Sequence, residues 1–194
     1  MFFKKPLIII IISLIPLFGF CQSYDNEKGG LSKENYYKLL AYGGWQIYID
    51  FLRSEDPNLV KKSKRYELLI ELSNFNDKYG EELINTIAIA LGSNNDELVH
   101  IDINLELFKK LSSLEQLSVL IHEFNHDFFN VMHTDINDEL NIMHPFALPN
   151  DQNEMSVMLR KFLRDYLNGN IDTFSEGFFV HDKTKNKLPY LKKF

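Results

Sequence analysis

The sequence has little cysteine, little positive charge and, beyond its first twenty residues, no long hydrophobic run. Cys21 is the only cysteine among 194 residues, so no disulfide can form within the chain, and stability must come from packing or from a bound metal. Lys and Arg number 21 against 27 Asp and Glu, and the formal charge of −6 disfavours a nucleic-acid partner. Because a spanning helix needs roughly 18 to 20 apolar residues, we expect no membrane span after residue 20.

The amino terminus has the pattern of an export signal. Two lysines precede the apolar stretch Pro6–Phe20, which the polar sequence QSYDNEKGG follows. The apolar stretch is shorter than a membrane span, so we expect residues 1–21 to be cleaved and Gln22 to become the new terminus. A competing interpretation makes Cys21 the lipid-carrying first residue of a lipoprotein, although the bulky Phe20 before it fits such a signal badly.

We therefore predict an exported protein, either periplasmic or secreted. Amino-terminal sequencing of the exported chain is expected to begin at Gln22, because cleavage removes the whole signal. Mass spectrometry that finds a diacylated Cys21 would instead establish the lipoprotein, and a membrane surface would then be a partner.

After the signal, the remaining chain is long enough for one domain and too short for two. Residues 22–34 are polar and contain Gly29 and Gly30, which predicts a flexible leader. The domain then covers residues 35–169, and residues 170–194 form a C-terminal tail without an interpretable pattern.

The first part of the domain contains two periodic segments. The stretch WQIYIDF at 45–51 alternates along its length, with Trp45 and Phe51 on the same side, which predicts a strand. An Asp-Pro pair at residues 56 and 57 is typical of a helix start, and apolar residues over Leu59–Asn74 predict the helix that follows.

A hairpin and a helix are predicted next. The runs INTIAIALG at 84–92 and ELVHIDIN at 97–104 are rich in β-branched residues and flank the turn-forming SNND, which predicts an antiparallel hairpin. Ser112 and Glu115 have the spacing of a capping box, and the apolar residues after them predict a helix as far as Phe128.

The last part of the domain contains a loop and a helix. Residues 134–150 are too acidic and too rich in proline for a regular element, whereas an amphipathic helix is predicted from Asp151 until Gly169 ends it. Together these segments predict an α+β fold with a short sheet.

The sequence LIHEFNHDFFNVMH at 120–133 concentrates three histidines and one glutamate in the predicted helix. His122 and His126 are four residues apart, so their side chains emerge about 40° apart on one face and can reach a single zinc ion. Glu123 is rotated by about 100° from His122 and can instead reach a water on the metal. This is the HExxH arrangement, in which the glutamate acts as general base.

A catalytic zinc usually has a third protein ligand, and His133 is the nearest candidate. Asn130 tolerates the left-handed conformation that ends a helix, so the chain can turn there and deliver His133 to the metal. Asp135 and Asp138 are the alternative third ligands.

HEFNH, the helix-ending Asn130, His133 and the sequence NIMHP at 141–145 together resemble the metzincin zinc peptidases. Their signature is HExxHxxGxxH followed by a methionine-containing turn. Here six residues instead of five separate His126 from His133, and Asn130 stands in the place of the glycine. A closer resemblance is to small, largely uncharacterised zinc peptidases of bacteria and their phages, which share the six-residue gap and the Ile-Met-x-Pro pattern.

The resemblance is at the level of motifs over residues 112–145, and it implies a small zincin-like domain. In such a domain a methionine turn and a C-terminal helix follow the zinc helix, and Met143 forms the floor beneath the ligands. The strand Leu98–Asn104 lies beside the cleft and pairs with an extended peptide or protein substrate. Some relatives have a tyrosine two residues after the turn methionine, and here that position is Pro145.

Two classes of function are consistent with these residues. The first is a zinc metallopeptidase with His122, His126 and His133 as zinc ligands and Glu123 as the catalytic base. The second is a noncatalytic binding module of metzincin-like fold that zinc only supports. A structural ion has no use for a general base and prefers four protein ligands, so Glu123 favours the enzyme.

Overall fold

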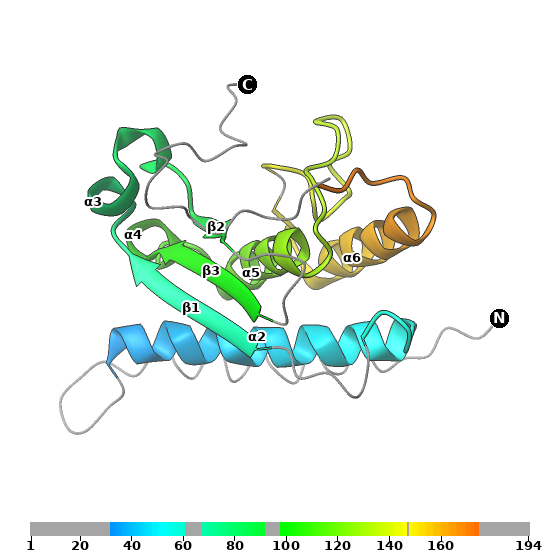
Figure 1. The fold of residues 1–194 in the computed structure, drawn as a ribbon, viewed down its shortest axis with the longest axis horizontal. Helices are drawn as coiled ribbons and strands as arrows, with labels where there is room; N and C mark the ends of the chain where they lie inside the picture. Colours follow the sequence, from blue (N-terminus) through cyan, green and yellow to red (C-terminus); the bar gives the residue numbers. More distant parts are fainter. Residues whose placement is uncertain (1–31, 61–66, 92–97, 147, 175–194) are drawn as a thin grey trace.

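The computed structural model describes residues 32–60, 67–91, 98–146 and 148–174, which have a mixed α+β fold (Figure 1). The elements in chain order are α2 (Lys33–Glu55), β1 (Glu67–Ser73), α3 (Phe75–Tyr79), a 3-10 helix (Glu81–Leu83), β2 (Ala88–Ala90), β3 (Leu98–Asn104), α4 (Leu105–Phe108), α5 (Ser113–Phe128) and α6 (Gln152–Leu167). None of the helices in these residues has the combination of length and hydrophobicity that a membrane span needs. The predicted export signal lies outside the described residues.

The three strands form one sheet in the order β1-β3-β2. β2 and β3 are antiparallel, with Ala88 opposite Ile103, as the sequence predicts, although the connecting residues 92–97 are outside the described part of the chain. β1 pairs with β3 in parallel along its whole length. β3 is therefore the central strand, and the expectation that it pairs with a substrate is wrong because both of its edges are occupied.

The prediction of a helix over Leu59–Asn74 is wrong, because β1 occupies the second half of that segment. Leu68, Ile70 and Leu72 alternate along the strand and pack against the main core, and Ile70 is only 3% exposed. The intervening Leu69 is 40% exposed. This period of two is that of a strand with one covered face, and the parallel pairing with β3 is a long-range contact that no local pattern encodes.

The prediction of a strand over residues 45–51 is also wrong, because these residues lie within α2. The Ser32 hydroxyl caps the helix by accepting a hydrogen bond from the Asn35 N–H at 3.2 Å, so the helix begins inside the predicted leader, residues 22–34. Its buried residues recur at helical spacing over several turns, whereas the alternation covers only seven residues. They are Leu40, Ala41, Trp45, Tyr48, Ile49, Phe51 and Leu52.

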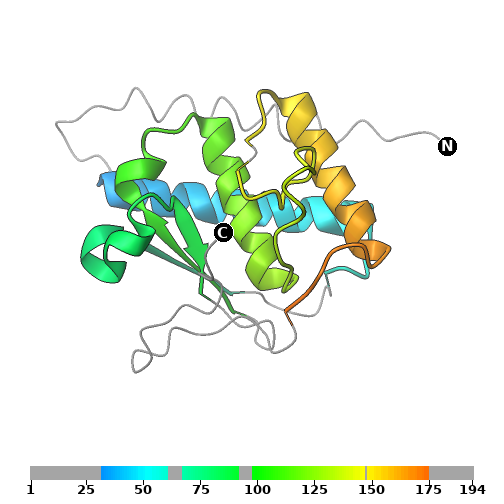
Figure 2. The ribbon, with the colours of Figure 1, turned by 90° about the horizontal axis from the view of Figure 1, so that it is seen from above.

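The main core lies between the sheet and the long helices. α2 crosses beneath the sheet and α5, and α6 lies on the side of α5 away from the sheet (Figures 1 and 2). A Cβ at Gly44 would lie 3.2 Å from Leu117 Cδ1, so the absence of a side chain there permits the close approach of α2 and α5. The Trp45 ring packs edge-on against Phe124 with centroids 5.0 Å apart. These contacts hold α5 against the core.

Candidate metal centre

α5 presents two histidines on one face, as the sequence predicts. Ser112 and Glu115 form the predicted capping box at its start, each side chain accepting a hydrogen bond from the other's backbone N–H. His122 and His126 lie one turn apart, with ring centroids 4.6 Å apart. Their Nε2 atoms are separated by 3.0 Å, so both rings point to one position.

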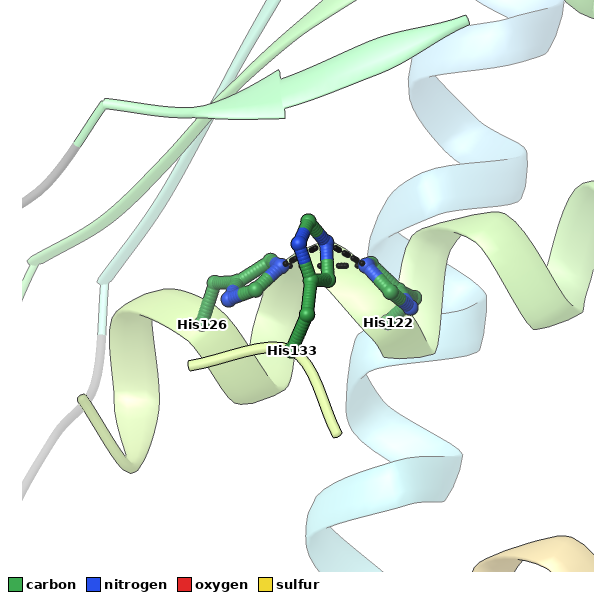
Figure 3. Close-up of side chains that lie close together, drawn as sticks. All are labelled: His122, His126 and His133. Carbon is green, nitrogen blue, oxygen red and sulfur yellow. Dashed lines mark hydrogen bonds between the residues drawn. The ribbon is translucent and has the colours of Figure 1, made fainter. Parts of the chain in front are cut away.

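The chain reverses after α5 and brings a third histidine to the same position. Asn130 has a φ of 54° and is the one non-glycine residue with positive φ among the described residues, which confirms the predicted left-handed helix end. His133 then places its Nε2 3.0 Å from the Nε2 atoms of both His122 and His126. Figure 3 shows the three rings converging, two from α5 and one from the loop that follows it.

Backbone carbonyls determine which nitrogen of two of the rings carries the proton. Nδ1 of His122 lies 2.7 Å from the Ile142 carbonyl oxygen, and Nδ1 of His126 lies 2.7 Å from the Val131 carbonyl oxygen. Because a carbonyl oxygen only accepts, each Nδ1 donates, and Nε2 of each neutral ring presents a lone pair. Two lone pairs therefore face each other across 3.0 Å, an arrangement that a bound cation would stabilise.

The three nitrogens fit a zinc ion. Two nitrogens bound tetrahedrally at about 2.0–2.1 Å lie roughly 3.3–3.4 Å apart, and the three Nε2 separations of 3.0 Å are close to that value. Within the described residues, the histidine triad is the one group of three or more His, Cys, Asp or Glu residues whose ligand atoms could share an ion. His126 is buried, His122 is partly buried and His133 is exposed, so the site opens to solvent beside His133.

All three rings are uncharged near neutral pH. Desolvation is the main cause: it lowers the pKa of His122 to about 3, and it also lowers the pKa values of His126 and His133. Repulsion between positive charges lowers these pKa values further: His133 and His144 act on His122, His122 and His133 act on His126, and His144 acts on His133. Neutral imidazole is the form that binds a metal, so the triad does not need to lose protons before binding.

Glu123 directly follows His122 in α5 and does not belong to the histidine triad. Its side chain is only 9% exposed, and burial raises the pKa of its carboxyl to about 8, against a smaller lowering by the backbone N–H of Ala90. Ala90 belongs to β2, and β2 packs against α5. The site thus combines three convergent nitrogen atoms with one separate, buried carboxyl group.

The acidic residues considered as alternative third ligands are engaged elsewhere. Asp135 Oδ1 accepts a hydrogen bond from the backbone N–H of Asn137 at 2.8 Å. Asp138 forms an ion pair with Lys161 at 2.6 Å. Neither carboxylate joins the histidine triad, so His133 is the third ligand that the geometry supports.

The NIMHP turn contacts the site through its backbone. Met143 is fully buried, and its carbonyl accepts a hydrogen bond from the Thr134 N–H, next to His133, at 3.0 Å. The His144 ring donates from Nε2 to the Ile136 carbonyl at 2.9 Å and accepts at Nδ1 from the Phe146 N–H at 3.1 Å. With both nitrogens in hydrogen bonds within the loop, His144 stabilises the loop and is not a metal ligand.

Some neighbours of the site could not be found in the sequence. Asp127 accepts a hydrogen bond from the His100 backbone N–H at 2.7 Å and links α5 to β3. The groups that orient His122 and His126 are the carbonyls of Ile142 and Val131. Because every residue has a backbone carbonyl, the residue types at positions 131 and 142 could not predict that their carbonyls orient the histidines.

Comparisons of the chain with protein-family models, with curated proteins and with solved structures found no match.

Asn130 supports a prediction about the metal site. Replacing Asn130 with valine is expected to prevent stoichiometric metal binding, because a β-branched residue adopts a positive φ only with strain. Glycine adopts this conformation freely, so Asn130→Gly should still bind one metal. The zinc content of both variants is measured after gel filtration. Full zinc loading of the valine variant would contradict the prediction.

The low histidine pKa values predict acid sensitivity of the metal-free protein. Folded-state pKa values below the usual 6.5 mean that protonation favours the unfolded chain, so stability should be present above pH 6.5 and fall as the pH drops toward 3. Glu123 has the opposite sign, because its raised pKa favours the folded state as the pH falls from 8 toward 4.5. Urea midpoints between pH 7 and 4 test this, and His122→Gln should show a weaker pH dependence. The prediction would be contradicted if the urea midpoint depended equally on pH in the wild type and in His122→Gln.

Proposed function

We propose that this chain is an exported zinc metallopeptidase with a metzincin-like domain. The observation that carries the proposal is that three imidazole nitrogens converge on one point that opens to solvent, with the buried Glu123 directly after His122 in α5. A purely structural zinc site usually closes all four positions with protein ligands, whereas this arrangement leaves a position open next to a potential base.

His122, His126 and His133 would hold the zinc ion. When bound there, zinc supplies Lewis acidity, which makes water easier to deprotonate and polarises the scissile carbonyl. The backbone carbonyls of Ile142 and Val131 keep two of the rings in the required tautomer.

Glu123 acts as the proton carrier of the reaction. It accepts a proton from the water that attacks the peptide carbonyl, and it then delivers that proton to the leaving amine. Its pKa of about 8 applies to a carboxyl beside three uncharged rings, and a cation held by those rings would lower it. A pKa between the usual carboxyl value of 4.5 and about 8 suits a group that both accepts and donates a proton near neutral pH.

In the proposed enzyme, a substrate would bind along β2. The Ile87 carbonyl and the Leu91 N–H bond to β3, so the backbone groups of Ala88 and Ala90 point away from β3. The Ala90 N–H reaches Glu123 on this side. An extended peptide that pairs with β2 would therefore pass beside the catalytic carboxyl, and β2 would take the role that the metzincin resemblance implied for Leu98–Asn104.

The metzincin-like assignment is supported by two features of the reversal after α5. Asn130 has the left-handed backbone that the family's glycine would provide, and the extra residue before His133 does not prevent its Nε2 from reaching the triad. Met143 is fully buried, and its backbone carbonyl accepts a hydrogen bond from the Thr134 N–H next to His133. The exported location follows from the sequence of residues 1–21 alone.

Metal analysis and a broad peptide assay test the proposal together. The mature protein, purified without chelators, should contain about one zinc per chain and should cleave members of a mixed peptide library, with activity lost on chelation and restored by zinc. Full zinc loading with no cleavage of any peptide would refute the peptidase and favour the noncatalytic binding module.

A further inference from the structure

The chain returns to the metal centre after α6. Gly169, with a φ of 70°, follows the end of that helix, and residues Asp172–Phe174 then lie antiparallel to Asn130–Met132, with Val131 opposite Thr173. We call Asp172–Phe174 the C-terminal clamp. It was part of the tail in which the sequence showed no pattern.

Three hydrogen bonds join the clamp to the reversal after α5. The Met132 N–H donates to the Asp172 carbonyl at 2.8 Å, and the Phe174 N–H donates to the Asn130 carbonyl at 3.0 Å. The Asn130 side chain donates from Nδ2 to the Phe174 carbonyl at 2.6 Å. Asn130 and Phe174 are 44 positions apart in the chain, so this contact is created only by the tertiary fold.

The residues that the clamp holds are those that position two of the metal ligands. In an extended segment the backbone groups of successive residues point to opposite sides. Asn130 and Met132 bond toward the clamp, so the carbonyl of Val131 points the other way, where it accepts the hydrogen bond from His126 Nδ1 at 2.7 Å. Met132 directly precedes His133 in the sequence.

The clamp itself is anchored in the main core. Ile171, immediately before it, is 7% exposed and belongs to the same hydrophobic cluster as Val131, which is fully buried. The position of the clamp is therefore set by packing that does not involve the histidines, as required of a support that holds the ligands in place before a metal binds.

We propose that the C-terminal clamp is a positioning element of the metal centre. It orients His126 through the Val131 carbonyl and places His133 through Met132, so the affinity for zinc depends on a segment that contributes no ligand. Loss of such outer partners typically lowers metal affinity by about 10- to 100-fold. The inference relies on the metal-binding part of the proposed function and is independent of hydrolysis.

A matched pair of variants in the full chain tests the clamp. Phe174→Pro removes the N–H that bonds the Asn130 carbonyl, whereas Phe174→Ala loses the same ring and keeps that N–H. Zinc affinity, measured by chelator competition, is expected to be at least about tenfold weaker in Phe174→Pro than in Phe174→Ala. The visible spectrum of the Co²⁺-loaded proline variant should also change, because the ligand geometry is altered.

The thermal midpoint of the metal-free proteins separates positioning from folding. Similar midpoints with different zinc affinities support the clamp, whereas equal affinities and identical Co²⁺ spectra in the two variants would overturn it. If Phe174→Pro does not fold, Asn130→Gly provides the second test, because it keeps the backbone conformation and removes the side-chain bond to Phe174. It should bind one zinc several-fold more weakly than the wild type, and an unchanged affinity would overturn the proposal.

Discussion

Replacing Glu123 with glutamine is expected to lower peptide hydrolysis by at least about two orders of magnitude, the usual scale for losing a positioned base. Glutamine preserves the size of the side chain and can still accept the hydrogen bond from the Ala90 N–H, but it cannot take up a proton. Glu123 does not belong to the histidine triad, so the variant should keep its zinc. The zinc content and kcat/KM for a cleaved peptide are the quantities to measure.

Two further variants make this result specific. Glu123→Ala should show the same loss of activity with zinc retained, and Glu139→Gln, which changes an exposed carboxylate of the loop after His133, should have wild-type activity. Cleavage that persists in a zinc-loaded Glu123→Gln protein would exclude Glu123 as the base.

Replacing His133 with alanine is expected to leave only weak, readily exchanged metal. The substitution removes one of three nitrogen atoms that lie 3.0 Å from one another, and the two histidines of α5 cannot complete a site alone. The loss of affinity should exceed the about 10- to 100-fold typical of losing a partner that only orients a ligand. Chelator competition and equilibrium dialysis measure it.

Asp135→Asn and Asp138→Asn are the controls for this experiment. Both carboxylates have other partners in the structure, Asn137 and Lys161, so their replacement should leave the zinc affinity unchanged. Unchanged affinity and stoichiometry in His133→Ala, together with a loss in one of the aspartate variants, would move the third ligand to the acidic loop.

The parts of the site that the sequence predicted correctly are local. The capping box of Ser112 and Glu115 involves residues three positions apart, and His122 and His126 are brought together by one turn of α5. The left-handed conformation of Asn130 is a property of one residue at a helix end. Such features depend on helix geometry and backbone sterics, which act between neighbours in the chain.

The wrong predictions concern elements in which a short pattern fits two structures. The seven residues from Trp45 to Phe51 alternate, yet they lie inside a helix of 23 residues whose buried face extends back to Leu40. The region Leu59–Asn74 begins after α2 has ended at Glu55, and its second half contains β1 (Glu67–Ser73), whose apolar residues alternate with the period of a strand. Burial against α5 determines the helical structure of the first segment, and parallel pairing with β3 determines the strand in the second. Both are long-range contacts.

By itself, the sequence determined the α5 helix, its paired histidines, the adjacent glutamate and the place where the chain turns, because each depends on residues within one or two turns. Only the tertiary structure decided that three Nε2 atoms converge, that β2 and not β3 runs beside Glu123, and that the carbonyls of Val131 and Ile142 orient two of the rings. These features join backbone groups from separate segments. A backbone group is the same in every residue, so its direction is set by packing and pairing across the fold and leaves no trace in the residue types.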